Sequence, residues 1–137
     1  MPDFDEINAK VIDEYRANGG ELSGGFAGET LILVHHFGAR SGTERVSPLA
    51  CYAEGPRLFV FASKAGLPEN PAWYHNLMAH PDVTVEFGDE TFPVRAVEIT
   101  GAERDEIYAK NVEQRPQFGE YQANVDRLIP VVELVRR

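Results

Sequence analysis

The chain has 137 residues, of which 43% are hydrophobic and 26% are charged, a size and balance typical of one globular domain without disulfide or metal support. Acidic side chains outnumber basic ones by 22 to 13, giving a formal net charge of −9 that repels polyanions, so nucleic acid is not an expected partner. Neither a transmembrane run nor a secretory signal is recognisable, and we expect a cytoplasmic protein made of a single domain, residues 1–137.

The first predicted element is an amphipathic helix within residues 1–20. A capping box at Asp3 and Glu6 opens it, and two glycines at positions 19 and 20 end it. We expect its apolar stripe to pack on the core, with a lid over the site or a peripheral contact with a membrane surface as alternatives. The stripe consists of Phe4, Ile7, Val11, Ile12 and Tyr15.

Strand-like runs follow the helix, and turns containing glycine at residues 54–57 and 87–90 read as hairpin connections, which implies antiparallel pairing. The only cysteine, Cys51, falls within the second run; it cannot form an internal disulfide, and we expect a small buried core residue rather than a catalytic thiol. The predicted strands cover residues 30–36, 45–54, 57–63, 83–87, 90–99 and 129–135.

Helices are predicted between the later strands. Asn70 is the expected N-cap of a helix that starts with Pro71 and ends before Pro81. A second capping box, Thr100 with Glu103, opens a helix over residues 102–112, and a further helical stretch is expected around 121–127. Six strands without alternating βαβ units predict a mainly β, α+β fold built on a small antiparallel barrel.

The segment GARSGTER, residues 38–45, is the strongest local feature and lies between two predicted strands. Arg40 and Arg45 flank a turn made of Ser41, Gly42 and Thr43. Backbone N–H groups of such a turn can converge on an anion, and arginine can bind two of its oxygens at once. The segment therefore predicts a cradle for phosphate or carboxylate; the alternative is a hairpin loop with solvated charges.

The charge distribution favours a small anionic ligand. Residues 40–64 carry four basic and two acidic side chains, a local net charge of +2 in an otherwise acidic chain. Lys64 could reach the same anion as the arginines. Beside it, Ala62 and Ser63 at a strand end would leave a narrow slot in which a planar ring could lie against the backbone.

The helix that follows offers aromatic and polar edges. Trp73 and Tyr74 can stack on a ring, and His75 and Asn76 can form hydrogen bonds. The alternative for Trp73 is a core contact shared with Leu77, four residues on. The histidines have no spacing that suits a metal site, so none is expected.

Taken together, these motifs resemble the deazaflavin-dependent nitroreductase family, relatives of the mycobacterial F420-dependent quinone reductases. The resemblance rests on GARSGTER with the Pro48-Leu49 pair, on ASKAGLPENPAWYHNLMAHPDVTVEFGDE, and on FGEYQ with IPVVEL, and runs from about Leu31 onward. It implies a split antiparallel β-barrel similar to flavin-binding barrels, and coenzyme F420 as the cofactor.

The resemblance also implies where the coenzyme lies. The phosphate and glutamate tail would meet the basic segment, namely Arg40, Ser41, Gly42, Thr43, Arg45 and Lys64. The ring would lie near Pro48, Leu49, Ala62 and Ser63. The opposite wall would consist of Asn70, Pro71, Trp73, Tyr74 and Asn76.

The expected reaction is hydride transfer from reduced F420 to a quinone, a nitroaromatic or a similar electron-poor acceptor. Tyr121 and Ser63 are the expected catalytic residues, Tyr121 as a donor to the acceptor oxygen. The alternatives are an FMN-binding reductase in the same barrel and a non-catalytic F420 carrier. A homodimer is compatible with this barrel type.

Two features depart from the family pattern. Many relatives carry threonines before the loop, whereas this chain has His35, His36 and Phe37. The substrate-side tyrosines of the quinone-reducing members are matched in part, by Tyr121 and Tyr52.

Overall fold

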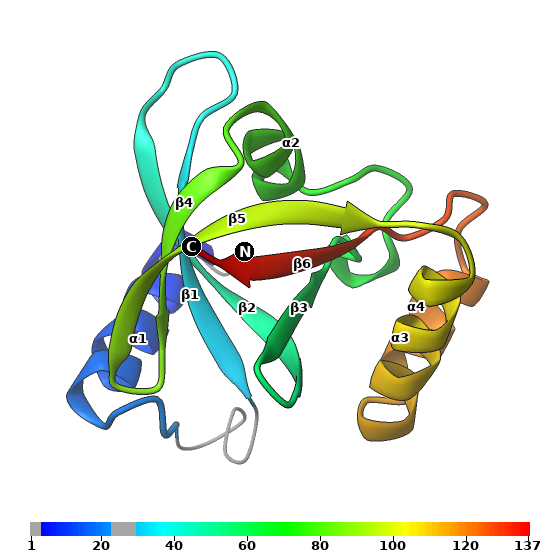
Figure 1. Cartoon of the computed structure of the whole chain (residues 1–137), viewed down its shortest axis with the longest axis horizontal. Coiled ribbons are helices and arrows are strands. Elements are labelled where there is room, and N and C mark those ends of the chain that lie inside the picture. The colour runs from blue at the N-terminus through cyan, green and yellow to red at the C-terminus, as the bar shows by residue number, and fades with distance from the viewer. Residues whose placement is uncertain (1–3, 23–29) are drawn as a thin grey trace.

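The computed structural model describes residues 4–22 and 30–137, and its centre is a closed six-stranded barrel (Figure 1). The strands are β1 (Leu31–Phe37), β2 (Glu44–Glu54), β3 (Arg57–Phe61), β4 (Asp82–Phe87), β5 (Glu90–Ile99) and β6 (Val131–Arg136). Around the barrel their order is β1-β2-β3-β6-β5-β4, and each neighbouring pair is antiparallel. The predicted antiparallel barrel is therefore confirmed.

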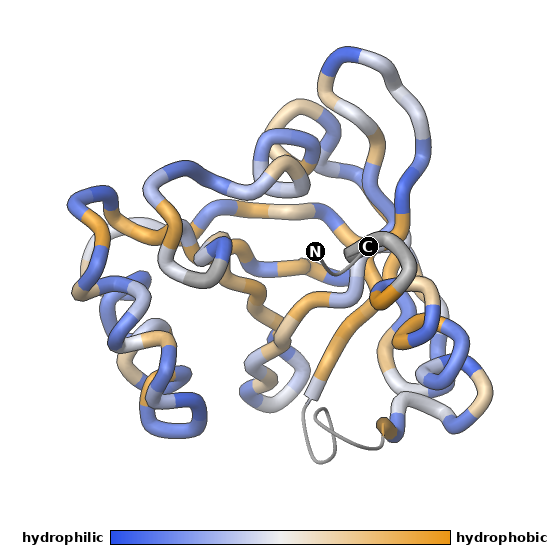
Figure 2. Tube along the Cα trace, turned by 180° about the vertical axis from the view of Figure 1, so that it is seen from behind, coloured by the Kyte–Doolittle hydropathy of each residue, from blue (hydrophilic) through white to orange (hydrophobic). Residues whose placement is uncertain are grey.

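The strands are buried on both faces where helices cover the barrel, which explains their continuous apolar runs. In β3, Leu58 and Val60 point into the barrel core, while Phe59 and Phe61 pack under helices on the outside. Figure 2 shows the hydrophobic residues following the strands, whereas the hairpin arm between β1 and β2 is largely hydrophilic. Cys51 is 1% exposed in the core, as expected.

Helix α1 (Phe4–Ala17) covers the outer face of β1, and Val11, Ile12 and Tyr15 of its predicted apolar stripe pack on the barrel. Tyr15 is 1% exposed, and its hydroxyl donates to the Leu31 carbonyl at 2.9 Å and accepts from the Gly88 N–H at 2.8 Å. Nearby, the Glu86 carboxylate accepts hydrogen bonds from Arg16. Ile7 stays 40% exposed, and Asp3 of the predicted capping box lies outside the described residues.

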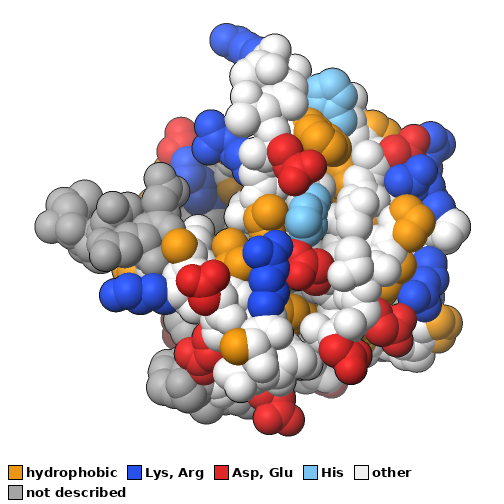
Figure 3. Space-filling model, turned by 90° about the vertical axis from the view of Figure 1, so that its left-hand side faces the viewer, with side chains coloured by type: hydrophobic (Ala, Val, Ile, Leu, Met, Phe, Trp, Pro, Cys, Tyr) orange, Lys and Arg blue, Asp and Glu red, His pale blue; other side chains and the backbone are white. Residues whose placement is uncertain are grey.

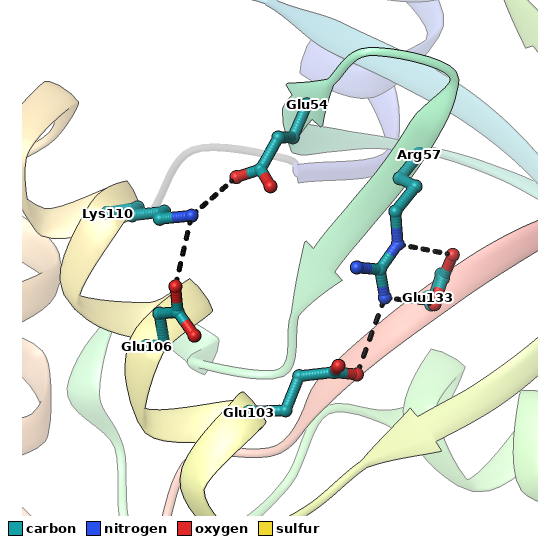
Figure 4. Close-up of polar contacts among 6 residues, drawn as sticks. All are labelled: Glu54, Arg57, Glu103, Glu106, Lys110 and Glu133. Carbon is teal, nitrogen blue, oxygen red and sulfur yellow. Dashed lines mark hydrogen bonds and ion pairs between the residues drawn. The ribbon is translucent and has the colours of Figure 1, made fainter.

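Helices α3 (Gly101–Gln114) and α4 (Gln117–Ala123) pack together on the outer face of β3 and β6. Ion pairs join this helical layer to the barrel (Figure 4). Arg57 binds Glu133 through two nitrogens, at 3.1 and 2.8 Å, and reaches Glu103 on α3 at 3.4 Å. Lys110 of α3 lies 3.0 Å from Glu54, at the end of β2.

The ends of the helices differ from the sequence prediction. In α2 (Ala72–Ala79) the N-cap residue is Pro71, and Asn70 does not cap it because its side chain binds Arg127 instead. Thr100 occupies the N-cap position of α3 but makes no side-chain capping bond, and Glu103 turns to Arg57. The sequence predicts the last helical stretch around 121–127, whereas α4 covers Gln117–Ala123.

Candidate functional site

A groove of about 810 Å³ lies between the β1–β2 hairpin arm and the first turns of α2. In Figure 3 the arm projects at the top of the molecule with a basic side chain at its tip. Among the described residues no acidic side chain lines the groove, although the protein is acidic as a whole. The lining residues are His36, Gly38, Ala39, Arg40, Ser41, Arg45, Ser47, Ala72, Trp73, His75 and Asn76.

The arm ends in a tight loop that its own backbone holds closed. The Gly38 N–H donates to the Thr43 carbonyl at 2.9 Å, and the Gly42 N–H donates to the Gly38 carbonyl at 2.9 Å. The Ser41 hydroxyl accepts from the Thr43 N–H at 3.2 Å. Gly42 has φ of +69°, a conformation that other residues rarely adopt, so glycine fits this position. The loop thus presents Arg40 at the groove.

Two arginines of the groove have no acidic partner. Within the described chain, no carboxylate pairs with Arg40 or Arg45, whereas Arg16, Arg57 and Arg95 each bind a carboxylate at 2.6 to 2.8 Å. Both guanidinium groups stand in an acid-free groove on an acidic protein. Such an arrangement fits a ligand that supplies its own negative charge.

Beneath the arginines, three polar side chains form a connected network. The Ala39 N–H donates to Asn76 Oδ1 at 2.9 Å, Asn76 Nδ2 lies 2.9 Å from His36 Nδ1, and His36 Nε2 lies 2.8 Å from Ser47 Oγ. His36 is 3% exposed and Asn76 is 7% exposed. Burial, followed by the nearby charge of Arg45, lowers the pKa of His36 below its ordinary value, which keeps the imidazole neutral.

Helix α2 supplies the other wall of the groove. Trp73 lines the groove and also packs on the barrel core beside the fully buried Leu77, so it serves both of the roles considered for it. Tyr74 turns away, since its hydroxyl lies 2.5 Å from Glu98. Burial and this carboxylate raise the pKa of Tyr74 to about 12.

A second set of the predicted residues gathers around Arg127, away from the groove lining. The guanidinium donates to the carbonyls of Ala62 (3.1 Å), Ser63 (2.9 Å) and Leu67 (3.1 Å), and to Asn70 Oδ1 at 2.6 Å. Arg127 therefore fixes the path of residues 62–70, which include the short helix η2 (Lys64–Gly66). Pro71, at the end of this segment, is buried.

Tyr121 lies on α4, against the same segment. Its ring contacts Phe118 with centroids 5.2 Å apart. A Cβ on Gly66 would come within 3.1 Å of the Tyr121 Cα, and Gly66 has φ of +81°, so only glycine allows this approach. Tyr121 is half-buried here and does not line the groove.

The remaining predicted residues take other places. Lys64 does not line the groove, because its ammonium binds Glu69 at 3.0 Å. Gly42 and Thr43 are exposed on the loop, while Pro48 and Leu49 are half-buried in β2 and pair with Leu33 and Ile32. Tyr52 is buried and donates to Glu54 at 3.0 Å.

Sequence reasoning missed His36, Ser47 and Arg127 as parts of these two regions. The strand pattern could have indicated two of them. Ser47 lies two residues after Arg45 and so shares its face of the strand, and His36 is the residue that pairs with Arg45 across β1 and β2. Nothing local to Arg127 indicated that it would reach residues 62–70. Cys51 is no nucleophile, since burial raises the pKa of its thiol to about 12.

Across residues 4–22 and 30–137, no three histidine, cysteine or acidic side chains gather as a metal site would require. No described helix is long and apolar enough to cross a membrane. The described part of the groove thus offers two arginines without a carboxylate partner in residues 4–22 and 30–137, a polar network and an indole wall.

Comparisons with known proteins agree with this picture. A family model described as F420H(2)-dependent quinone reductase matches residues 8–135. An F420H(2)-dependent quinone reductase of Mycobacterium tuberculosis is 34% identical over 129 residues, covering 90% of this chain and 85% of the relative.

Two solved structures are similar in fold and sequence. One is described as an F420-H2 dependent reductase: it is 40% identical, covers 77% of this chain and 93% of its own, and superimposes with a TM-score of 0.71. The other, described as a domain-swapped dimer, is 32% identical, covers 96% and 98% of the two chains, and has a TM-score of 0.72.

Proposed function

The chain belongs to the F420H(2)-dependent quinone reductase family, and on this basis we propose that it transfers hydride from reduced coenzyme F420 to a quinone. The observation that carries the proposal is the acid-free groove with Arg40 and Arg45 left without acidic partners in the described chain. F420 is an anionic coenzyme with a phosphate and a glutamate tail, so its charge fits these arginines.

The residues of the groove bind and orient the coenzyme. Arg40 and Arg45 neutralise its anionic part, and Ser41 adds a hydroxyl beside them. Trp73 offers an aromatic wall. When bound, reduced F420 supplies a two-electron hydride, so the protein needs to align donor and acceptor and exclude water rather than provide a nucleophile.

Ser63 and Tyr121 are the proposed residues on the acceptor side. Both belong to the region that Arg127 organises, where residues 62–70 meet α4. The Tyr121 hydroxyl can donate a hydrogen bond to the oxygen on which charge develops. None of the other residues predicted around the ring lines the groove: Ala62, Asn70 and Pro71 belong to the region around Arg127, and Pro48 and Leu49 lie in β2.

A titration tests the coenzyme. The purified protein is titrated with F420 and separately with FMN, following Trp73 fluorescence at several salt concentrations. We expect F420 to bind more tightly and its affinity to fall as salt rises, because the arginine contacts are screened. Clear FMN binding without F420 binding would make the protein a flavin enzyme, and binding of neither would remove the coenzyme assignment.

The acceptor is tested with reduced F420 in excess. A quinone such as menadione is the proposed substrate, and a nitroaromatic compound is the second acceptor class. Oxidation of F420 is followed by absorbance with each acceptor. Tight F420 binding without hydride transfer to any acceptor would instead identify a carrier.

Two further proposals concern the surroundings of the enzyme. The similarity to a structure described as a domain-swapped dimer supports a homodimer, which light scattering after size exclusion would detect as twice the mass of the chain. The exposed Ile7 on α1 supports a peripheral membrane contact, and cosedimentation with anionic vesicles tests it.

A further inference from the structure

The direction of every hydrogen bond in the His36 network follows from one backbone group. The Ala39 N–H can only donate, so the Asn76 atom 2.9 Å away is the amide oxygen. The amide nitrogen of Asn76 therefore faces His36 Nδ1, also at 2.9 Å. Because an NH₂ group can only donate, Nδ1 of His36 carries a lone pair and no proton.

This fixes the other end of the imidazole. A neutral histidine with an unprotonated Nδ1 carries its proton on Nε2, which then donates to the Ser47 oxygen at 2.8 Å. The Ser47 hydroxyl hydrogen must point elsewhere, and Ser47 lines the groove. Among the described residues the only hydrogen-bond partner of this hydroxyl is His36, which donates to it, so the hydroxyl hydrogen has no acceptor there.

We propose that Asn76 and His36 are positioning residues that leave the Ser47 hydroxyl hydrogen free to donate to an anionic oxygen of the ligand held in the groove. This inference rests on the proposed function for the identity of that ligand, F420. Its chemistry is general, because the donor would serve any phosphate or carboxylate placed between Arg40 and Arg45.

The groups around His36 disfavour protonation of its Nδ1 atom. On its own strand the neighbouring His35 faces Glu86 on the outer surface, and across the hairpin Arg45 brings positive charge to the groove side. From α2, Asn76 meets it with a donor, and His75 lies farther along the groove. A proton added at Nδ1 would face the Asn76 NH₂ group, and turning that amide would break its bond to Ala39.

The proposed role also fits the neutral character of Asn76, His36 and Ser47. A neutral donor strengthens an anion site without placing a further buried cation beside Arg45, which would be costly in a half-enclosed groove. Ser47 alone could rotate to accept from or donate to the ligand. When its oxygen accepts from His36, the hydroxyl hydrogen cannot point back at the imidazole and is available to the ligand.

The first test reads the tautomer directly in the ligand-free protein. Nitrogen-15 NMR of histidine side chains distinguishes a protonated Nε2 from a protonated Nδ1. We expect His36 as the neutral Nε2–H form at pH 7. The Nδ1–H form would overturn the inference, whether or not F420 binds.

The second test measures dissociation constants for F420, with inorganic pyrophosphate as an independent anionic probe. Ser47→Ala and His36→Leu should each weaken binding about tenfold, as expected for loss of a hydrogen bond to a charged group. The double variant should be no weaker than either single one, because His36 acts through Ser47. His36→Gln, whose amide can still donate to Ser47, should restore most of the affinity.

His80→Gln is the matched control, since His80 is exposed and does not line the groove. Circular dichroism and the melting temperature establish whether each variant folds. If His36→Leu does not fold, the affinities of His36→Gln and Ser47→Ala test the inference. Unchanged affinity of Ser47→Ala for both probes would overturn the inference. Pyrophosphate binding that responds to these variants, without F420 binding, would support the donor and reject the proposed coenzyme.

Discussion

Arg127 donates a hydrogen bond of 2.6 Å to the side-chain oxygen of Asn70, a residue 57 positions earlier in the chain. The same guanidinium binds three carbonyls of the segment that leads into α2. One side chain thereby positions Ser63 and Asn70, which were both predicted as site residues, without itself belonging to the groove lining.

Replacing Arg127 with glutamine should loosen residues 62–70 and cost about 2 kcal/mol of unfolding free energy, since the part-buried carbonyls of Ala62 and Ser63 lose their donor. Urea denaturation measures the loss, and limited proteolysis locates it. Arg127→Lys should be nearly as unstable, because an ammonium lacks the planar fork that serves several acceptors at once. If either variant kept the full unfolding free energy, residues 62–70 would not depend on Arg127 for their conformation.

Removing the positive charge of the groove should weaken coenzyme binding and leave the chemistry intact. We expect Arg40→Gln or Arg45→Gln to raise the KM for F420 about tenfold with little change in kcat, because the arginines contact a part of the ligand that does not react. The salt dependence of binding should also become shallower. Arg95→Gln is the control, since Arg95 is exposed and pairs with Asp82; an equal effect there would point to net charge alone.

The lowered pKa of His36 predicts a stability that depends on pH. Burial is the main cause of the shift and the charge of Arg45 is the second. Below the ordinary value of 6.5 the unfolded chain takes up a proton that the folded chain refuses, so the unfolding free energy should decrease as pH falls from about 7 towards the lowered pKa. Urea denaturation at several pH values measures this dependence. The unfolding free energy of His36→Gln should change less with pH than that of the original protein. Equal changes would assign the pH dependence to other groups.

The ion pair between Arg57 on β3 and Glu133 on β6 should stabilise the pairing of these two barrel strands, and it holds the guanidinium that also reaches Glu103 on α3 (Figure 4). Glu133→Gln keeps the size of the side chain and removes its charge, and we expect a loss of about 1 kcal/mol, modest because the Arg57 side chain is 37% exposed. Denaturation at low and high salt measures it. Glu90→Gln, which breaks an exposed pair with Arg136, should cost less.

Tyr121→Phe tests the proposed donor to the acceptor oxygen. Loss of the hydroxyl should lower kcat with quinones several-fold while the dissociation constant of F420 stays unchanged, since Tyr121 does not line the groove. The ring and its packing on Phe118 are kept, so stability should not change. Unaltered turnover with several quinones would remove Tyr121 from the mechanism.

The barrel was predictable because its signals are local. Alternating and continuous apolar runs marked all six strands, and the glycine turns at 54–57 and 87–90 gave two antiparallel pairs that the structure contains. Closure was less accessible, since the pairing of β3 with β6 joins residues far apart in the sequence. The helix ends were the weakest part: Asn70 and Glu103 have the right types for capping, yet Arg127 and Arg57 compete for them.

The site was predictable in composition more than in arrangement. Five of the residues predicted to bind the coenzyme line the groove: Arg40, Ser41, Arg45, Trp73 and Asn76. Lys64 was expected beside the anion, but the acidic Glu69 nearby binds it instead. The role of His36 could not be inferred from sequence because it depends on an amide from α2, forty positions away.

The strand order has a consequence for how the protein is made. β6 is the last described strand in the chain, yet it sits between β3 and β5 and bonds to both. On a ribosome the other five strands emerge first, leaving an open sheet whose β3 and β5 edges can pair with another chain until β6 arrives. Slower synthesis of the α3–α4 region would prolong that interval, so translation speed over residues 101–130 should affect the yield of folded protein.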